Sequence, residues 1–180
     1  MLILVRHAQP IIDSNKPSAE WQLSADGRNR SRELAEQLRT YQPDIVITSR
    51  EPKAAETGRI IAETLGLPYE TAENLHEHRR TGEFVSQEKF QQQVRGFFER
   101  PTELVFGLET AEQALERFET AVSQVIGRHP NKNIIIAAHG TVMTLFIAAH
   151  NPTIAPLPFW QQLQMPDYFI LEQPNLELVE

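Results

Sequence analysis

The sequence contains no cysteine among its 180 residues. Disulfides, thiolate metal sites and cysteine nucleophiles are therefore excluded together, and this composition favours a cytoplasmic setting. Long hydrophobic runs are also missing, because the apolar start from Leu2 to Val5 ends at Arg6. That run is far shorter than a signal-peptide core or a membrane span needs. We therefore expect no targeting segment and no membrane partner.

Positive charge is scarce. Lys and Arg number 17 against 24 Asp and Glu, which gives a net charge of −7. A nucleic acid or an anionic membrane requires an extended electropositive surface, so neither is an expected partner. Glycine is also infrequent, and no glycine-rich loop of the kind that holds nucleotide phosphates occurs. Any phosphate site must be a local positive pocket on an acidic molecule.

The composition that remains is that of an ordinary globular protein, with 41% hydrophobic and 23% charged residues. This length supports one well-packed core, and there is no repeat, low-complexity tract or linker. We therefore predict a single domain over residues 1–180. Oligomeric state cannot be derived from this pattern.

Short apolar, β-branched runs alternate with segments of helical periodicity. The predicted strands are residues 2–5, 44–48, 69–71 and 133–138, with edge strands near 168–171 and 176–179. The predicted helices are residues 28–41, 49–65, 87–100, 109–128 and 141–150, with a short helix around 157–160. Glu109 and Glu112 are placed in the first turn of their helix, and Ser49 is the expected N-cap of the second helix. The alternation predicts an α/β sandwich with a mostly parallel sheet.

Three strand ends carry polar groups: Arg6-His7, the segment Ser49 to Lys53, and His139-Gly140. The carboxyl ends of parallel strands share one edge of a sheet, so these groups can meet there. The last two also open helices, whose N-terminal amides attract anions. Two histidines, an arginine and a lysine in such a place predict a site for a phosphoryl group.

Four motifs in the sequence resemble those of a known protein family. They are Leu4 to Ala8, Thr48 to Thr57, Leu75 to Glu77, and His139-Gly140. In this order they resemble the "R-H-G", "S-S-P-x-x-R-A-x-Q-T", "L-x-E" and second-histidine motifs of the histidine phosphatase superfamily, which includes phosphoglycerate mutases and many small-molecule phosphatases. The resemblance covers nearly the whole chain. It implies a three-layer fold like that of phosphoglycerate mutase, with helices on both faces of the sheet.

The resemblance also implies roles for individual residues, and it requires no metal or cofactor. His7 becomes the nucleophile that is phosphorylated, Glu77 the general acid, and His139 a hydrogen-bond donor to the transferring group. The phosphate-binding set is Arg6, Lys53, His139, Asp13 and Arg50.

Two of these positions depart from the family pattern: alanine replaces the glycine after His7, and Lys53 replaces the second phosphate-binding arginine. Lysine keeps the charge but lacks the planar fork that holds two phosphate oxygens. Arg50, three residues earlier, is expected to lie on the same side of the helix and supply part of that fork. Glu77 needs a raised pKa to hold a proton, which an arginine at position 79 or 80 would oppose.

Each candidate also has a purely structural alternative. His7 and His139 could be hydrogen-bonded histidines of the core, Arg6 a surface ion-pair partner, and Glu77 a solvated loop residue. Lys53 could lie on an exposed helix face, and Asp13 could simply stabilise a turn. His76 and His78 flank Glu77 in a His-x-His pattern, but without a third ligand they are expected to be surface groups rather than a metal site.

We therefore predict a phosphatase that hydrolyses a small phosphomonoester through a phosphohistidine. No large insertion separates Glu77 from His139, and mutases of the family tend to be longer. The alternatives are a phosphoglycerate mutase-type phosphotransferase, or a non-catalytic phosphate or phosphoprotein binder weakened by Lys53. Selectivity is expected in the segments 11–23 and 83–107, where the sequence does not identify the substrate.

Overall fold

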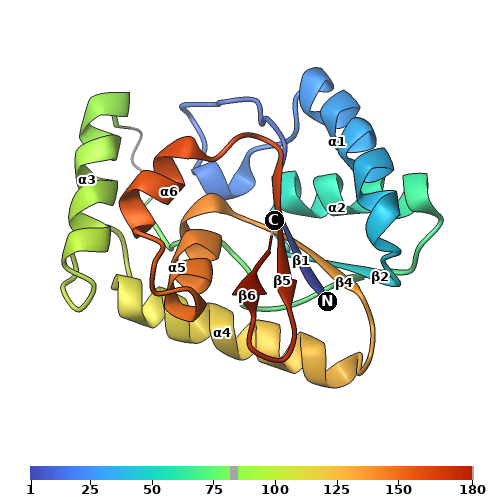
Figure 1. Cartoon of the computed structure of the whole chain (residues 1–180). Helices are drawn as coiled ribbons and strands as arrows, with labels where there is room; N and C mark the ends of the chain where they lie inside the picture. The colour runs from blue at the N-terminus through green and yellow to red at the C-terminus, as the bar shows by residue number, and fades with distance from the viewer. Residues whose placement is uncertain (82–84, 180) are drawn as a thin grey trace.

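A computed structural model describes residues 1–81 and 85–179 of the chain. Within these residues, one sheet has the strand order β3-β2-β4-β1-β5-β6 (Figure 1). The strands are β1 (Leu2–Arg6), β2 (Ile45–Thr48), β3 (Tyr69–Thr71), β4 (Ile134–Ala138), β5 (Asp167–Glu172) and β6 (Glu177–Leu178). The first four strands are mutually parallel, and β5 and β6 are antiparallel additions at one side. The predicted strands and the mostly parallel sheet are confirmed.

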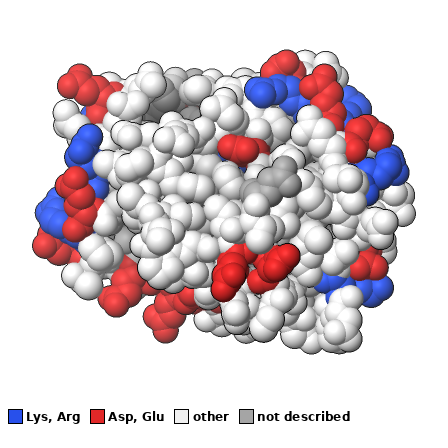
Figure 2. Space-filling model, viewed as in Figure 1, with Lys and Arg blue, Asp and Glu red and all other residues white. Residues whose placement is uncertain are grey.

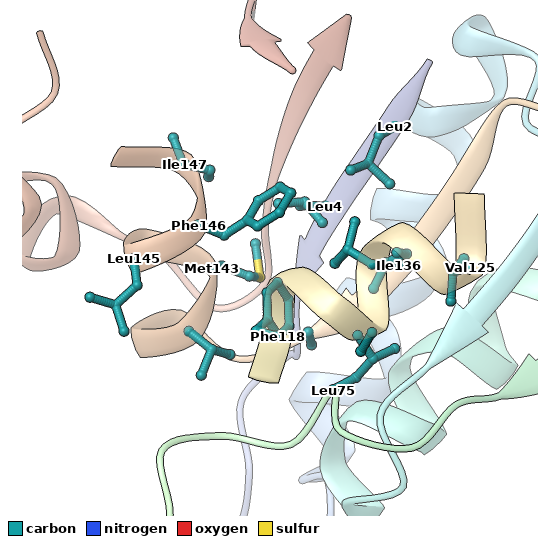
Figure 3. Close-up of a cluster of buried hydrophobic side chains, with 14 of the residues drawn as sticks. Leu2, Leu4, Leu75, Phe118, Val125, Ile136, Met143, Leu145, Phe146 and Ile147 are labelled. Atoms are coloured by element: carbon teal, nitrogen blue, oxygen red, sulfur yellow. The ribbon is translucent and has the colours of Figure 1, made fainter. Parts of the chain in front are cut away.

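Helices cover both faces of this sheet (Figure 1). On one face, α1 (Ala25–Leu38) and α2 (Pro52–Leu65) pack on Ile3, Val5 and Ile135. On the other, α4 (Ala111–Arg128) and α5 (Gly140–His150) pack on Leu2 and Leu4. Figure 3 shows this second layer, with Phe118 and Phe146 meeting between the two helices. The remaining helices are α3 (Gln87–Glu99), α6 (Pro156–Gln162), and the short 3-10 turns Ser18–Glu20 and Arg39–Tyr41. The predicted three-layer fold is confirmed.

The strand sequences explain this double coverage. Successive side chains of a strand point to opposite faces of the sheet. Leu2 and Leu4 therefore enter one core and Ile3 and Val5 the other, and all four are fully buried. An uninterrupted apolar run is what a strand covered on both faces requires.

Several predicted helix boundaries were wrong. α1 begins at Ala25, three residues before the predicted start at Arg28. The Ser24 hydroxyl accepts the Gly27 N–H and caps the helix at this earlier point. Ser49 is not the N-cap of α2; Glu51 holds that position and Pro52 begins the helix. Proline favours that position because it has no N–H to satisfy and a helical φ. Thr110 caps α4, so only Glu112 lies in the first turn and Glu109 precedes the helix.

The expected selectivity segment 83–107 begins with Glu83 and Phe84, which lie outside the described residues. The other long loop, residues 11–23, is closed by an antiparallel bridge between Pro10 and Leu23. It therefore returns to the sheet edge beside the end of β1.

Candidate functional site

Three parallel strands end at one place and bring the predicted residues together. Arg6 lies opposite Ala138, and Thr48 lies opposite Ala137. The next residue of each outer strand continues the ladder: His7 N–H donates to the Ala138 carbonyl at 3.0 Å, and Ser49 N–H to the Ala137 carbonyl at 2.9 Å. The imidazole rings of His7 and His139 consequently lie 5.3 Å apart.

The hydrogen bonding of His7 fixes which of its two ring nitrogens carries the proton and which faces the site with a free lone pair. Its Nδ1 lies 2.9 Å from the Ala8 carbonyl oxygen. A carbonyl can only accept, so in the neutral ring Nδ1 carries the proton and Nε2 the free lone pair. Burial, reinforced by the charge of Lys53, lowers the pKa of His7 to about 3. The ring is therefore neutral at physiological pH.

Arg6 is held beside this ring by main-chain carbonyls. Its Nη1 donates to Leu163 O at 2.9 Å and to Gln164 O at 3.1 Å. Its Nε is buried and has no hydrogen-bond partner among the described residues. Burial lowers the pKa of Arg6, but arginine stays protonated in proteins. A fixed cation with a spare buried donor is suited to an anion.

Lys53 lies in the first turn of α2, and its side chain is only 6% exposed. Its ammonium donates to the Ser18 carbonyl at 2.7 Å and forms an ion pair with the Glu51 carboxylate. The expectation of an exposed helix face does not apply to this lysine. It is part of the buried cluster that includes His7 and His139, because it contributes to the lowered pKa of both.

His139 follows β4 and is the N-cap residue of α5. Its Nε2 lies 2.9 Å from Ser49 Oγ, while its Nδ1 is buried without a hydrogen bond among the described residues. Burial holds the pKa of His139 well below its usual value, and the charge of Lys53 acts in the same direction. A second neutral imidazole therefore faces His7.

Glu77 reaches the same cluster from a loop. Its carboxylate accepts the N–H groups of Thr141 and Val142 at the N-terminus of α5, and that of His78. Burial alone would raise the pKa of Glu77, but Arg80 and these backbone donors outweigh it and lower the pKa to about 2. The raised pKa that Glu77 would need in order to hold a proton is therefore not present in the ligand-free protein. Glu77 is therefore an anion at rest.

The loop that carries Glu77 is anchored by a buried ion pair. The Arg117 guanidinium donates to Glu109 at 2.7 Å and to the carbonyls of Asn74, His76 and Glu77. His78 is also buried and packs against two phenylalanine rings, with its Nε2 3.1 Å from the Glu109 carbonyl oxygen. The expectation that His78 is a surface group was wrong. These contacts define the position of the Glu77 main chain.

Replacing Arg117 by Met is expected to lower the free energy of unfolding by about 3 kcal/mol, because the buried Glu109 carboxylate then keeps only the backbone N–H and the exposed guanidinium of Arg79 as partners. Urea denaturation measures this loss. Arg95→Met, which removes an exposed pair with Glu99, is the matched control and should change stability by less than about 1 kcal/mol. Equal losses in both variants would contradict the anchoring role.

Two predicted phosphate-binding residues are not brought to the cluster. Arg50 precedes α2, so helical spacing does not relate it to Lys53, and its exposed guanidinium pairs with Glu73. Asp13 accepts the Asn15 N–H at 3.0 Å and lies 3.8 Å from Lys16 Nζ, in an exposed turn. In the ligand-free protein Arg50 and Asp13 thus have other partners, and the part of the chain that the structure describes shows neither in contact with His7 or His139. Arg6, His7, Lys53, Glu77 and His139 do converge.

Sequence reasoning missed two residues of this cluster. Glu51 is half of the Lys53 ion pair and lies close to His139, and Ser49 contacts His139 rather than capping a helix. Both belong to the strand-end segment that the sequence singled out. No periodicity could tell which of their side chains turn inward, because the segment between Thr48 and Pro52 is irregular.

A pocket of about 320 Å³ opens beside the cluster. It is lined by Pro17, Ser18, Ala19, Glu51, His76, Glu77, His78, Arg79, Arg80 and Leu108. The loop 11–23 thus supplies one wall and the Glu77 loop the other. Arg80 borders it with its guanidinium carbon 4.6 Å from the centroid of the Phe90 ring. This size suits a small molecule.

On the face shown in Figure 2, Lys and Arg side chains lie among Asp and Glu and form no broad basic area. Within residues 1–81 and 85–179, no group of three or more His, Asp or Glu side chains is arranged to hold a metal ion. In the same residues, no helix is both long and apolar enough to span a membrane.

Gly140 allows Arg6 to lie against the start of α5. A Cβ at this position would lie 3.0 Å from Arg6 Nε and 3.3 Å from Leu163 Cδ1. Gly140→Ala is therefore expected to displace the guanidinium and weaken orthophosphate affinity about tenfold, measured by calorimetric titration. Gly127→Ala, where no atom beyond the neighbouring backbone of its own helix lies within 4 Å of the added carbon, is the control. Unchanged affinity in the Gly140 variant would show that Arg6 does not contact the anion.

Acidification is expected to destabilise the protein through its buried histidines. His7, His78 and His139 all have a lowered pKa in the folded state, so the unfolded chain binds more protons below about pH 6.5. Stability should fall with pH in this range by up to about 1.4 kcal/mol per pH unit for each histidine. Urea midpoints at pH 7, 6 and 5 measure the slope, and His7→Asn should make it shallower. An unchanged slope in that variant would contradict the burial of a neutral His7.

Comparison with known proteins agrees with this geometry. The family model "Histidine phosphatase superfamily (branch 1)" matches residues 2–169. The chain belongs to this superfamily. An uncharacterized phosphatase of Bacillus subtilis (strain 168), PhoE, is 28% identical over 121 residues, which are 67% of this chain and 60% of that protein. The chain thus aligns with less than two thirds of this relative's length.

Solved structures of two phosphatases have a similar fold. A mycobacterial glucosyl-3-phosphoglycerate phosphatase in complex with VO3 has a TM-score of 0.77 at 19% identity, covering 99% of this chain and 95% of that one. A phosphoserine phosphatase variant from Entamoeba histolytica in complex with phosphoserine has a TM-score of 0.76 at 18% identity, covering 99% and 94%. At these identities the likeness establishes the fold.

Proposed function

We propose that the protein is a phosphatase that hydrolyses a small phosphomonoester through a phosphohistidine on His7. The observation that carries this proposal is the state of His7: Nδ1–H is committed to the Ala8 carbonyl, so the neutral ring offers Nε2 as a nucleophile. Arg6 and Lys53 supply positive charge beside it. Family membership and fold relatives crystallised with phosphoserine and VO3 support the same reading.

In the first step, His7 Nε2 attacks phosphorus and an N–P bond forms while the bond to the leaving oxygen breaks. The electron pair of that bond stays on the leaving oxygen, which takes a proton from Glu77. Because Glu77 is ionised at rest, the proton arrives with the substrate. A phosphomonoester monoanion, abundant below its second pKa of about 6, carries it in. Arg6, Lys53 and the spare donor of His139 neutralise charge on the phosphoryl oxygens.

In the second step, Glu77 acts as a base. It takes a proton from a water molecule whose oxygen attacks phosphorus, and the N–P bond breaks with its electron pair returning to His7 Nε2. The proton leaves with inorganic phosphate. The lowered pKa of Glu77 suits this step, because the ionised carboxylate is the form required.

A non-catalytic phosphate binder is the second candidate, and one observation favours it. Lys53 has two partners in the ligand-free protein, the Ser18 carbonyl and the Glu51 carboxylate, so its charge is partly neutralised. Such a lysine would bind phosphate more weakly than a free arginine. Turnover distinguishes the two candidates.

Phosphate release from p-nitrophenyl phosphate and a panel of phosphorylated metabolites, including phosphoglycerates, tests the proposal. We expect hydrolysis without added metal, and an acid-labile phosphoryl group on His7 when the reaction is quenched in base and analysed by mass spectrometry. Isomerisation of a phosphoglycerate without net hydrolysis would indicate a mutase. Binding of orthophosphate without turnover of any substrate would indicate the binder.

A further inference from the structure

Glu51 adds a fourth charged group to the cluster, beside Arg6, Lys53 and Glu77, and the proposed reaction gives it no part. Its side chain is 11% exposed. One carboxylate oxygen, Oε1, accepts the Glu77 N–H at 2.8 Å. The other, Oε2, forms the ion pair with Lys53 and lies 3.7 Å from His139 Nδ1.

The nearby imidazole is oriented to donate toward Oε2. Ser49 Oγ accepts the Glu51 N–H at 3.3 Å, so the hydroxyl proton remains available to His139 Nε2, 2.9 Å away. A neutral ring that accepts at Nε2 carries its proton on Nδ1. That Nδ1 is buried and has no hydrogen-bond partner within the described residues. Lys53 Nζ and, at 3.7 Å, His139 Nδ1 thus lie beside the same carboxylate oxygen.

A phosphoryl oxygen would use the same two donors. We propose that the Glu51 carboxylate occupies the phosphoryl-oxygen position of the ligand-free site and is displaced when a phosphomonoester binds. The identity of this position rests on the proposed function. Two anions cannot share one pair of donors without strong repulsion, so the carboxylate must release Lys53.

The surroundings allow this movement. Glu51 lines the 320 Å³ pocket together with Arg79 and Arg80, so its carboxylate can turn toward other cations. Lys53 keeps its bond to the Ser18 carbonyl and stays in place without Glu51. The side chain of Glu51, although at the N-cap position of α2, makes no capping hydrogen bond there. In the ligand-free protein Glu51 therefore balances the charge of Lys53. Because this carboxylate must be displaced, it lowers the affinity of the site for phosphate.

Two substitutions separate displacement from simple loss of charge. Glu51→Gln removes the charge and the ion pair. Glu51→Asp keeps the charge, but aspartate is a strong N-cap residue and its shorter carboxylate is drawn to the amides of α2. Glu63→Gln removes a charge from an exposed pair on the same helix and serves as the control.

The test is calorimetric titration with orthophosphate at pH 7. We expect at least tenfold tighter binding to the Gln variant, equivalent to about 1.4 kcal/mol, and severalfold tighter binding to the Asp variant. The Glu63 control should bind as the wild type does. Equal or weaker binding to the Gln variant would overturn the proposal and make Glu51 a support for Lys53. A tighter Gln variant beside an unchanged Asp variant would also overturn it, because charge alone would then account for the effect.

This titration needs no turnover, so it is independent of the proposed catalysis. If the wild type binds phosphate but hydrolyses nothing, the phosphatase proposal fails while the ratio of affinities still decides the role of Glu51. If turnover through His7 is observed and the affinities do not change, only the role of Glu51 fails. Absence of phosphate binding in all four proteins would overturn the displacement proposal.

Discussion

His7→Ala is expected to lower kcat for phosphomonoester hydrolysis by at least about 10⁴-fold and to abolish the phosphoenzyme. The variant lacks the only group whose free lone pair faces the site from the end of β1. The folded structure should persist, because the hydrogen bond from the His7 N–H to Ala138 belongs to the backbone. Rapid-quench assays for phosphate release and for the phosphorylated protein measure both effects.

The matched control is His150→Ala. His150 lies at the other end of α5 and contacts Glu119, outside the cluster, so this variant should keep its turnover. Hydrolysis that survives in His7→Ala at more than about a hundredth of the wild-type rate would exclude a covalent role for His7. Loss of turnover in both variants would point to a general loss of structure instead.

Glu77→Gln is expected to lower kcat by about 10³-fold for alkyl phosphates, whose leaving oxygen needs a proton. For p-nitrophenyl phosphate the leaving group departs unprotonated, so the first step should be affected much less. The second step still lacks its base, and a burst of p-nitrophenol with accumulation of phosphohistidine should result. Stopped-flow absorbance measures the burst. Glu73→Gln, an exposed carboxylate of the same loop, is the control.

The pH dependence of kcat/KM has a definite sign in this mechanism. Falling pH from 8 toward 5 should raise kcat/KM for alkyl phosphates, because more substrate then carries the proton that ionised Glu77 lacks. The decline at still lower pH should follow His7, whose pKa is about 3, rather than an ordinary histidine near 6.5. A decline centred on pH 6.5 would contradict a buried, neutral His7.

A burst that is absent in Glu77→Gln would assign the base to another group.

Much of the fold could be predicted from the sequence because its signals are local. Runs such as Ile134 to Ala138 are apolar on every residue, which only a strand covered on both faces requires. The boundaries of helices were less predictable. Ser49 reads as a cap in sequence, but the ring of His139, ninety residues away, takes its hydroxyl instead. The sequence around Ser49 does not indicate such a competing partner, because that partner comes from a distant segment.

The residues of the candidate site likewise divide into those that the sequence could predict and those that it could not. Arg6, His7 and His139 were predictable because Arg6 ends a buried strand, His7 and His139 each directly follow one, and the ends of parallel strands meet at one edge of the sheet. Arg50 and Lys53 could not be ranked by spacing, since the helix begins only at Pro52 and one side chain turns outward to Glu73 while the other is buried. The pKa of Glu77 was equally out of reach, because it depends on α5 amides and on Arg80.

The sequence by itself determined the parallel sheet, the strand ends that carry two histidines and an arginine, and the exclusion of cysteine chemistry. Only the tertiary structure decided that Glu51 enters the site, that it pairs with Lys53 there, and that Glu77 rests as an anion. The physical reason is that alternation and hydrophobicity are properties of neighbouring residues. Charge state and hydrogen-bond partners instead depend on groups that meet only after β1, β2 and β4 have paired and the two flanking loops have closed over their ends.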